Sequence, residues 1–302
     1  MKRVVSAAVL ALALAAGGCA GAQSATKSGS ATADGVRYDA ALNAKLPASV
    51  RSRGEIRLVT SAGYAPMEQL AADQQTIIGF EPDLASALGS VLGIKITMVK
   101  GNFDSALDDT AKGSYDGVLA SMNDTPQREK KADFIDYFQA GTSILVQRGN
   151  PRGVTDLNDL CGQVVATEAG TVQDDLLHRS QHSCGSNKMT IREFKSNFEA
   201  LQQLRTGRAI AVLNDYPPAA YLASDAKTRG YYQLASTVQY EPGLFGIAIA
   251  KSNGALRDAL RAALDRLIRS GAYAELLQRW SLTGGGLSAS TINAGTGTAG
   301  GS

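Results

Sequence analysis

Residues 115–128 read YDGVLASMNDTPQR, and this stretch says more about the protein than any other part of the sequence. Its first half, residues 115–120, is an apolar run that predicts a buried strand ending in a loop. The loop offers a hydroxyl, an amide and then the guanidinium of Arg128. Arginine carries a rigid fork of N–H donors that fits a carboxylate in two parallel hydrogen bonds. The stretch therefore indicates a ligand site at the carboxyl end of a strand.

A second apolar run, residues 209–212, ends in a similar way. It leads into residues 213–217, LNDYP, and places the carboxylate of Asp215 just beyond the strand. One fixed cation and one fixed anion at strand ends would match the carboxylate and the ammonium of a free amino acid. Taken alone, either charge is equally well explained as an ordinary surface charge.

Strand-like and helix-like segments alternate between two low-complexity ends, which indicates α/β architecture with mainly parallel pairing. Strands are predicted at residues 56–60, 94–99, 115–120, 163–167, 209–213 and 245–250. Helices are predicted at residues 81–92, 104–111, 197–205 and 256–268. The segment between the two ends has about 235 residues, which is enough for two lobes of ordinary domain size.

From Gly54 to about Ser281 the chain resembles the family 3 extracellular solute-binding proteins, the amino-acid receptors of ABC importers. The matching segments follow the family's order and include residues 54–60, 64–66, 79–85, 115–128, 133–136, 157–162, 170–171, 200–215, 245–249 and 271–280. The resemblance implies the type II periplasmic-binding-protein fold, in which two hinge strands join two α/β lobes. Lobe 1 would comprise residues 50–139 and 246–281, and lobe 2 residues 140–245.

The resemblance also implies how the α-carboxylate of an amino acid is held. Arg128 matches the arginine that binds it, and Ser121 and Asn123 match small polar residues of the same loop. Gly170 and Thr171 resemble the turn of the facing lobe that contacts the same carboxylate through an N–H group and a hydroxyl. Glycine at position 170 permits close approach of the backbone.

The rest of the ligand would be recognised by residues of both lobes. Asp215 matches the acid that receives the α-ammonium. Tyr64 and Phe103 match two aromatic walls around the ligand side chain, although core packing alone would explain two aromatic residues. Glu168 would face either the ligand side chain or solvent. Ser61 stands where receptors for basic amino acids often carry aspartate, so with Glu68, Glu168 and Gln173 it favours a polar amino acid, such as glutamine, glutamate or asparagine, over apolar and basic ones.

The N-terminal segment resembles a lipoprotein signal. Residues 1–18 combine Lys2-Arg3, a short apolar run and small residues before Cys19, which would be lipidated with palmitate among its acyl chains. Plain secretion with cleavage elsewhere is the alternative. Residues 19–49 are predicted to form a flexible tether, and residues 284–302 a disordered tail. The protein is thus expected to be lipid-anchored at the extracytoplasmic face of the cell membrane.

The two remaining cysteines, Cys161 and Cys184, form one even pair in an oxidising compartment, which predicts a disulfide. Two free thiols are the alternative. The spacing of His178, His182 and Cys184 is compatible with zinc. A disulfide would occupy Cys184, so no metal is expected.

Charge and motif content exclude several functions. The chain has 30 Lys plus Arg and 28 Asp plus Glu; removing the signal leaves 28 of each, which offers no basic footprint for nucleic acid. No Gly-x-Ser-x-Gly motif occurs, and no histidine can be placed in the cleft, so neither a catalytic residue nor a cofactor is expected. The sequence predicts a monomer that delivers an amino acid to an ABC permease. A sensor subunit and an enzyme on the same fold are the alternatives.

Overall fold

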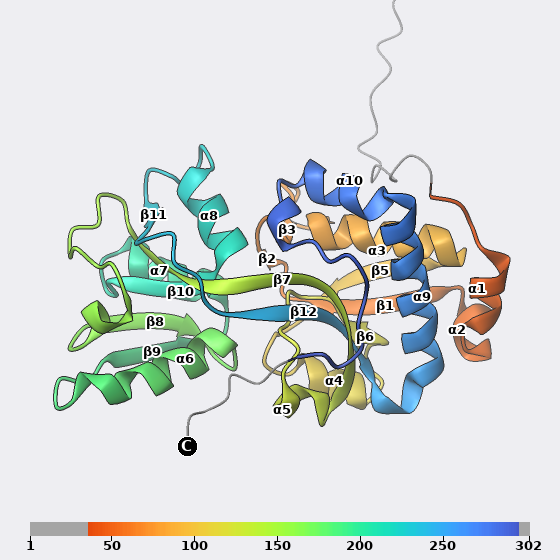
Figure 1. The fold of residues 1–302 in the computed structure, drawn as a ribbon, viewed down its shortest axis with the longest axis horizontal. Coiled ribbons are helices and arrows are strands. Elements are labelled where there is room, and N and C mark those ends of the chain that lie inside the picture. Colours follow the sequence, from red (N-terminus) through yellow and green to blue (C-terminus); the bar gives the residue numbers. More distant parts are fainter. Residues whose placement is uncertain (1–35, 296–302) are drawn as a thin grey trace, which may run out of the picture.

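The computed structural model describes residues 36–295, and these form two lobes joined by two long strands (Figure 1). The signal segment and Cys19 lie outside the described residues. One continuous sheet runs through both lobes in the order β5-β1-β6-β12-β7-β10-β8-β9, with β11 pairing β7. The predicted α/β architecture is confirmed, but the sheet is mixed and not mainly parallel, because the two strands that cross between the lobes pair antiparallel with their neighbours.

The first lobe contains the parallel strands β5, β1 and β6. Its elements are α1 (Ala40–Lys45), α2 (Ala48–Arg53), β1 (Glu55–Thr60), α3 (Phe80–Leu92), β5 (Lys95–Lys100), α4 (Ala106–Ala111), β6 (Gly117–Val118), α5 (Pro126–Glu129), α9 (Gly254–Ser270) and α10 (Ala272–Arg279). A small antiparallel sheet joins β2 (Gly63–Tyr64), β3 (Glu68–Leu70) and β4 (Ile77–Ile78). Helices α3 and α9 pack together, and their buried leucines form much of the core of this lobe.

The second lobe contains the parallel strands β10, β8 and β9. Its elements are β8 (Val164–Glu168), α6 (Val172–Ser180), β9 (Thr190–Phe194), α7 (Asn197–Arg205), β10 (Ala211–Asp215), α8 (Tyr216–Ser224) and β11 (Tyr232–Leu234). Buried aliphatic residues on both faces of the sheet, such as Leu177 and Leu204, make its core. The helices therefore cover both faces of the lobe.

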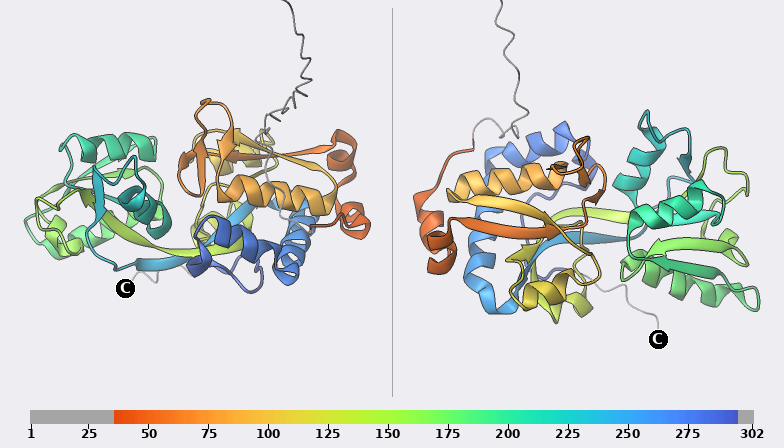
Figure 2. Two further views of the ribbon diagram at one scale, coloured as in Figure 1. Left: turned by 90° about the horizontal axis from the view of Figure 1, so that it is seen from above. Right: turned by 180° about the vertical axis from the view of Figure 1, so that it is seen from behind.

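Two antiparallel strands, β7 (Ala132–Gln147) and β12 (Tyr240–Ala250), cross between the lobes (Figures 1 and 2). The 16 residues of β7 pair with β12 in the first half and with β10 and β11 in the second half. A single strand thus belongs to both lobes, and rotation of the lobes about these strands would open the space between them.

Two sequence predictions are corrected at the chain ends. Residues 40–45 and 48–53 are helical, so the tether predicted for residues 19–49 ends earlier; Asp39 caps α1 and pairs with Arg266 at 3.0 Å. Part of the predicted disordered tail, residues 284–295, lies along β7. There Thr291 donates to Asp136 at 2.6 Å, and the Gly295 N–H donates to Asp124 at 2.8 Å. Specific polar contacts place this segment despite its low-complexity composition.

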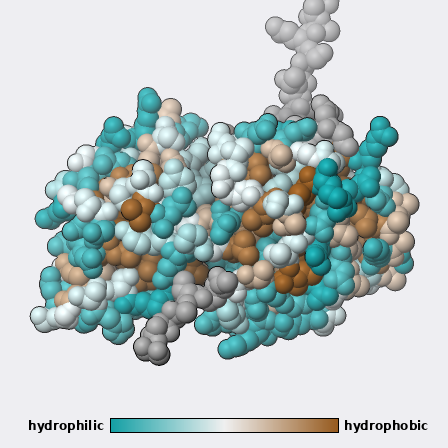
Figure 3. Space-filling view, in the orientation of Figure 1, coloured by the Kyte–Doolittle hydropathy of each residue, from teal (hydrophilic) through white to brown (hydrophobic). Residues whose placement is uncertain are grey.

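Residues 36–295 contain no helix long and apolar enough to cross a membrane. Hydrophilic residues cover most of the face drawn in Figure 3, and apolar residues appear there in small groups. The predicted disulfide is confirmed: Cys161 and Cys184 are bonded, with their Cα atoms 5.3 Å apart.

Candidate ligand site

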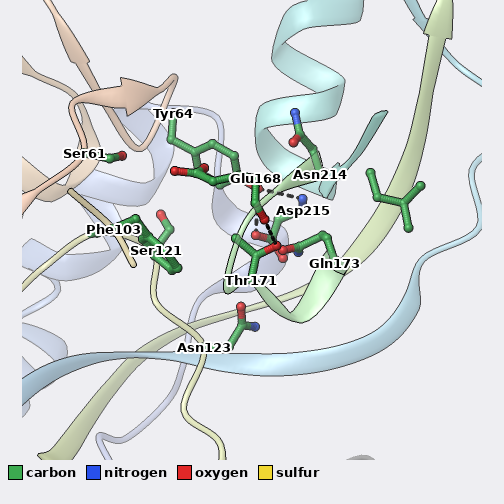
Figure 4. A pocket seen from close by; sticks show the side chains of 12 residues that line it. Ser61, Tyr64, Phe103, Ser121, Asn123, Glu168, Thr171, Gln173, Asn214 and Asp215 are labelled. Carbon is green, nitrogen blue, oxygen red and sulfur yellow. Dashed lines mark hydrogen bonds between the residues drawn. The ribbon is translucent and has the colours of Figure 1, made fainter. Parts of the chain in front are cut away.

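A cavity lies between the two lobes, where polar side chains converge from both sides (Figure 4). Its lining comprises Ser61, Tyr64, Phe103, Ala120, Ser121, Asn123, Glu168, Thr171, Gln173, Leu213, Asn214 and Asp215. Seven of the nine predicted ligand-binding residues are among them. The other two, Arg128 and Gly170, meet at its rim: the Arg128 guanidinium donates to the Gly170 carbonyl at 2.9 Å.

The strands explain this convergence. Ser61 follows β1, Ser121 follows β6, and Glu168 and Asp215 are the last residues of β8 and β10. The carboxyl ends of parallel strands in each lobe point at the other lobe, and ligand sites of α/β proteins lie at such ends.

Asp215 is the buried anion of the cavity, with 3% of its surface exposed. The Tyr64 hydroxyl donates to its Oδ2 at 2.8 Å and accepts from its backbone N–H at 2.8 Å, which links the two lobes. Its Oδ1 is buried and has no hydrogen-bond partner of normal geometry among residues 36–295. Burial raises the pKa of Asp215 to about 7, although Tyr64, Gln173 and Arg128 all lower it.

Arg128 is the cation at the rim of the cavity. It lies in α5, whose N-terminus is capped by the Thr125 hydroxyl. Its guanidinium donates to the carbonyl oxygens of Asn123 at 2.8 Å and Gly170 at 2.9 Å, and lies 5.5 Å from the centre of the Phe103 ring. Burial lowers the pKa of Arg128 to about 10, so it is charged at neutral pH.

The hydroxyl of Thr171 serves the fold. It accepts from the Asp174 N–H at 3.2 Å as the N-cap of α6 and donates to the Glu168 carbonyl at 2.8 Å. Its proton is therefore already in use. A carboxylate would instead meet the N-terminal end of α6, where backbone N–H groups and the helix dipole favour negative charge.

Glu168 is the second acid of the cavity. Burial, together with the nearby Asp104 and Glu199, raises its pKa to about 7, against a hydrogen bond from the Asn197 backbone that lowers it. Its carboxylate would accept from any donor on a ligand side chain. Glu168 is among the residues that line the cavity.

Asn214 was not predicted from the sequence. Its side-chain nitrogen is buried without a hydrogen-bond partner in the described part of the chain, so a donor is available in the cavity. Successive side chains of a strand point to opposite faces of the sheet, so the sequence does not predict that neighbours such as Asn214 and Asp215 line the same site. Both line it because β10 ends there and α8 begins at once.

His178, His182 and Cys184, whose spacing is compatible with zinc, do not come together as one ligand set. Cys184 is in the disulfide, and His178 instead lies 3.5 Å from Asp174 and 3.1 Å from Glu193 on the outer side of lobe 2. These three could hold a metal ion by spacing alone, but His178 and Glu193 are about half exposed, and exposed acidic groups commonly lie together without a metal.

Comparison with known proteins agrees with this architecture. The Arginine-binding protein ArgT of Corynebacterium glutamicum is 28% identical over 256 residues, which cover 83% of this chain and 82% of ArgT. The ABC transporter glutamine-binding protein GlnH of Bacillus subtilis is 26% identical over 211 residues, covering 68% of this chain and 72% of GlnH.

Among solved structures, an ancestral arginine-binding protein bound to arginine superimposes with a TM-score of 0.69 at 28% identity, covering 76% of this chain and 98% of that one. The ancestral amino acid-binding protein AncCDT-1, described as a precursor of cyclohexadienyl dehydratase, gives 0.68 at 30% identity and covers 77% and 97%. The model of the bacterial extracellular solute-binding proteins, family 3, matches residues 56–283, and this chain belongs to that family.

Proposed function

We propose that this protein captures a free L-amino acid between its lobes and presents it to the permease of an ABC importer. The observation that carries the proposal is the pair of fixed opposite charges at the cavity. Asp215 is a buried anion inside it, and Arg128 is a cation at its rim. An amino acid has the matching pair of charges at a fixed separation, so it can satisfy both residues at once.

The hydrogen bonds of the closed protein indicate how each end of the ligand is received. An ammonium would donate to Oδ1 of Asp215 and compete with the Tyr64 hydroxyl for Oδ2. The guanidinium of Arg128 would turn from two carbonyl oxygens to the ligand carboxylate, which is the stronger acceptor because its bond is charge-assisted. Ligand contacts thus replace contacts within the protein.

The small volume of the cavity implies that the lobes open to admit a ligand and close around it. Its volume is about 20 Å³, which is room for one water molecule, so an amino acid enters only after the lobes separate. Both lobes then contact the ligand, which favours the closed arrangement by its higher affinity for that state. A permease could distinguish loaded from empty receptor by shape.

The cavity favours a polar amino acid. Tyr64 and Phe103 would contact the carbon chain of the ligand, while Ser61, Glu168 and Gln173 offer polar groups to its end. A relative named for glutamine agrees with the polar side chain expected from the sequence, whereas one named for arginine extends the range to a basic side chain, which the sequence did not favour.

The family places the protein outside the cytoplasm, and we propose that a lipid on Cys19 holds it at the membrane as a monomer. Binding without catalysis is proposed because both acids of the cavity have ligand contacts to make. Neither of the two histidines lies in the cavity.

A thermal-shift screen against the twenty amino acids tests the proposal. A ligand at a hundred times its Kd stabilises by about 2.7 kcal/mol, which is easily measured. Small-angle scattering should then show a smaller radius of gyration with the best ligand. An unchanged radius with proven binding would contradict the closure mechanism, and loss of uptake on gene deletion would separate transport from sensing.

A further inference from the structure

Two glutamates lie directly behind the cavity, and both side chains are fully buried: Glu68 on β3 and Glu81 in the first turn of α3. The backbone brings them together. The N–H of Glu81 donates to the Met67 carbonyl at 3.0 Å. The same carbonyl packs against Gly79, which has φ +141°; a side chain at position 79 would place its Cβ only 2.2 Å from the carbonyl oxygen, so glycine is needed there. The carboxyl groups of the two glutamates are hydrogen-bonded to each other.

Their hydrogen bonds indicate where the proton lies. Oε1 of Glu81 accepts from the Ser121 N–H at 2.7 Å, from the Ser121 hydroxyl at 2.9 Å and from the Tyr137 hydroxyl. Oε1 of Glu68 is 3.1 Å from the Ser61 hydroxyl. Both Oε2 atoms are buried and have no other partner among the described residues, so one proton shared between them satisfies both.

Glu68 is the glutamate that holds the proton. Burial raises its pKa well above the usual range, as do Glu81 beside it and Glu168 across the cavity. Burial also raises the pKa of Glu81, but the donors from Tyr137 and Ser121 lower it again. The position of Glu81 at the N-terminus of α3 further favours the negative charge on Glu81.

The shared proton fixes the direction of two serine hydroxyls. Oε1 of each glutamate can only accept, so Ser61 and Ser121 must both donate away from the cavity that they line. Toward the cavity each hydroxyl then offers only lone pairs, so Ser121, whose N–H also bonds Glu81, does not supply the hydrogen bond to the ligand carboxylate that the family resemblance implied. Ser121 is held firmly, because its strained backbone, at φ +49°, is fixed by the N–H bond to Glu81.

We propose that the Glu68–Glu81 pair turns this side of the cavity into a surface of hydrogen-bond acceptors, which selects amino acids whose side chain ends in N–H donors. Amide, guanidinium and ammonium ends are accepted, and carboxylate ends are rejected because they would face serine lone pairs and Glu168. The inference rests on the proposed function and narrows it, since glutamate and aspartate are polar but excluded.

Calorimetric titration of the purified protein at pH 8 with glutamine, arginine, glutamate and aspartate tests the inference. The tighter of glutamine and arginine should bind at least tenfold more tightly than either acidic amino acid. Equal or tighter binding of glutamate or aspartate would overturn the inference and leave amino-acid capture intact. No heat with any amino acid would instead remove the proposed function itself.

Two variant series assign the effect to the pair. Ser61→Ala should lower the preference for glutamine over glutamate at least fivefold, whereas Ser90→Ala, whose hydroxyl bonds the Ser86 carbonyl away from the cavity, should leave it unchanged. Glu68→Ala should lower the preference, and Glu68→Gln should restore it, because its amide supplies both the donor to Glu81 and the acceptor for Ser61. A purely structural role would change the melting temperature of these variants and not the preference.

Discussion

Replacing Asp215 by asparagine should weaken amino-acid binding and stabilise the unliganded protein at the same time. Burial raises the pKa of this carboxyl from 3.8 to about 7, so the folded protein resists its ionisation. Ionisation of Asp215 therefore lowers the free energy of unfolding; this effect is absent below pH 4 and complete above pH 7. At pH 7 it corresponds to about 4 kcal/mol, because each tenfold change in the ionisation constant is worth 1.36 kcal/mol.

Asparagine has no charge to bury, but its amide must still be hydrogen-bonded, so we expect a net gain of about 2 kcal/mol. For a chain of this size the melting temperature would rise by about 4–8 °C. The ammonium of a bound amino acid would lose its buried partner, at about 3 kcal/mol, which is roughly 150-fold in Kd.

Differential scanning fluorimetry without ligand, at pH 5 and pH 8, measures the first effect, and calorimetry the second. The gain should be larger at pH 8, where the wild-type carboxyl is ionised. Asp258→Asn is a matched control, since that side chain is 59% exposed on α9 and distant from the cavity. A lower melting temperature for Asp215→Asn, or a Kd within fivefold of wild type, would refute the reasoning.

Three further predictions follow from the same contacts. Arg128→Ala should abolish both binding and compaction, whereas Thr171→Ala should chiefly destabilise α6, by about 1 kcal/mol, as seen by calorimetry and scattering. Amino-acid affinity should fall as the pH drops below 7. The fall is up to tenfold per pH unit for each acid, Asp215 or Glu168, that must be ionised to bind the ligand; an affinity that does not change between pH 5.5 and 8 would count against this. Reducing the Cys161–Cys184 disulfide should lower the free energy of unfolding by about 3 kcal/mol in denaturant titrations.

Periodic elements could be predicted from the sequence because local patterns determine them. The helix predicted at residues 197–205 has those bounds in α7, and the leucine spacing of residues 256–268 lies within α9. Strand lengths and strand partners could be predicted less well. The strand predicted at residues 115–120 is reduced to Gly117–Val118, and the 16-residue β7 was suggested only by family resemblance.

The residues of the site could be predicted because each follows a strand, but their hydrogen bonds could not. Thr171 was expected to offer its hydroxyl to the ligand, yet that proton is used within the fold. Such contacts join segments distant in sequence, as Tyr64 and Asp215 are. The ordered tail was missed for the same reason: composition says nothing about Thr291 meeting Asp136.

The central claim is that opposite fixed charges at the cavity grip both ends of one amino acid. Calorimetric titration with the best amino acid of the screen, with the amine that lacks its carboxylate and with its N-acetyl derivative tests this claim most directly. Each analogue leaves one of Arg128 and Asp215 unpaired, so both should bind at least a hundredfold more weakly. Equal affinity for the amine that lacks the carboxylate would contradict the account.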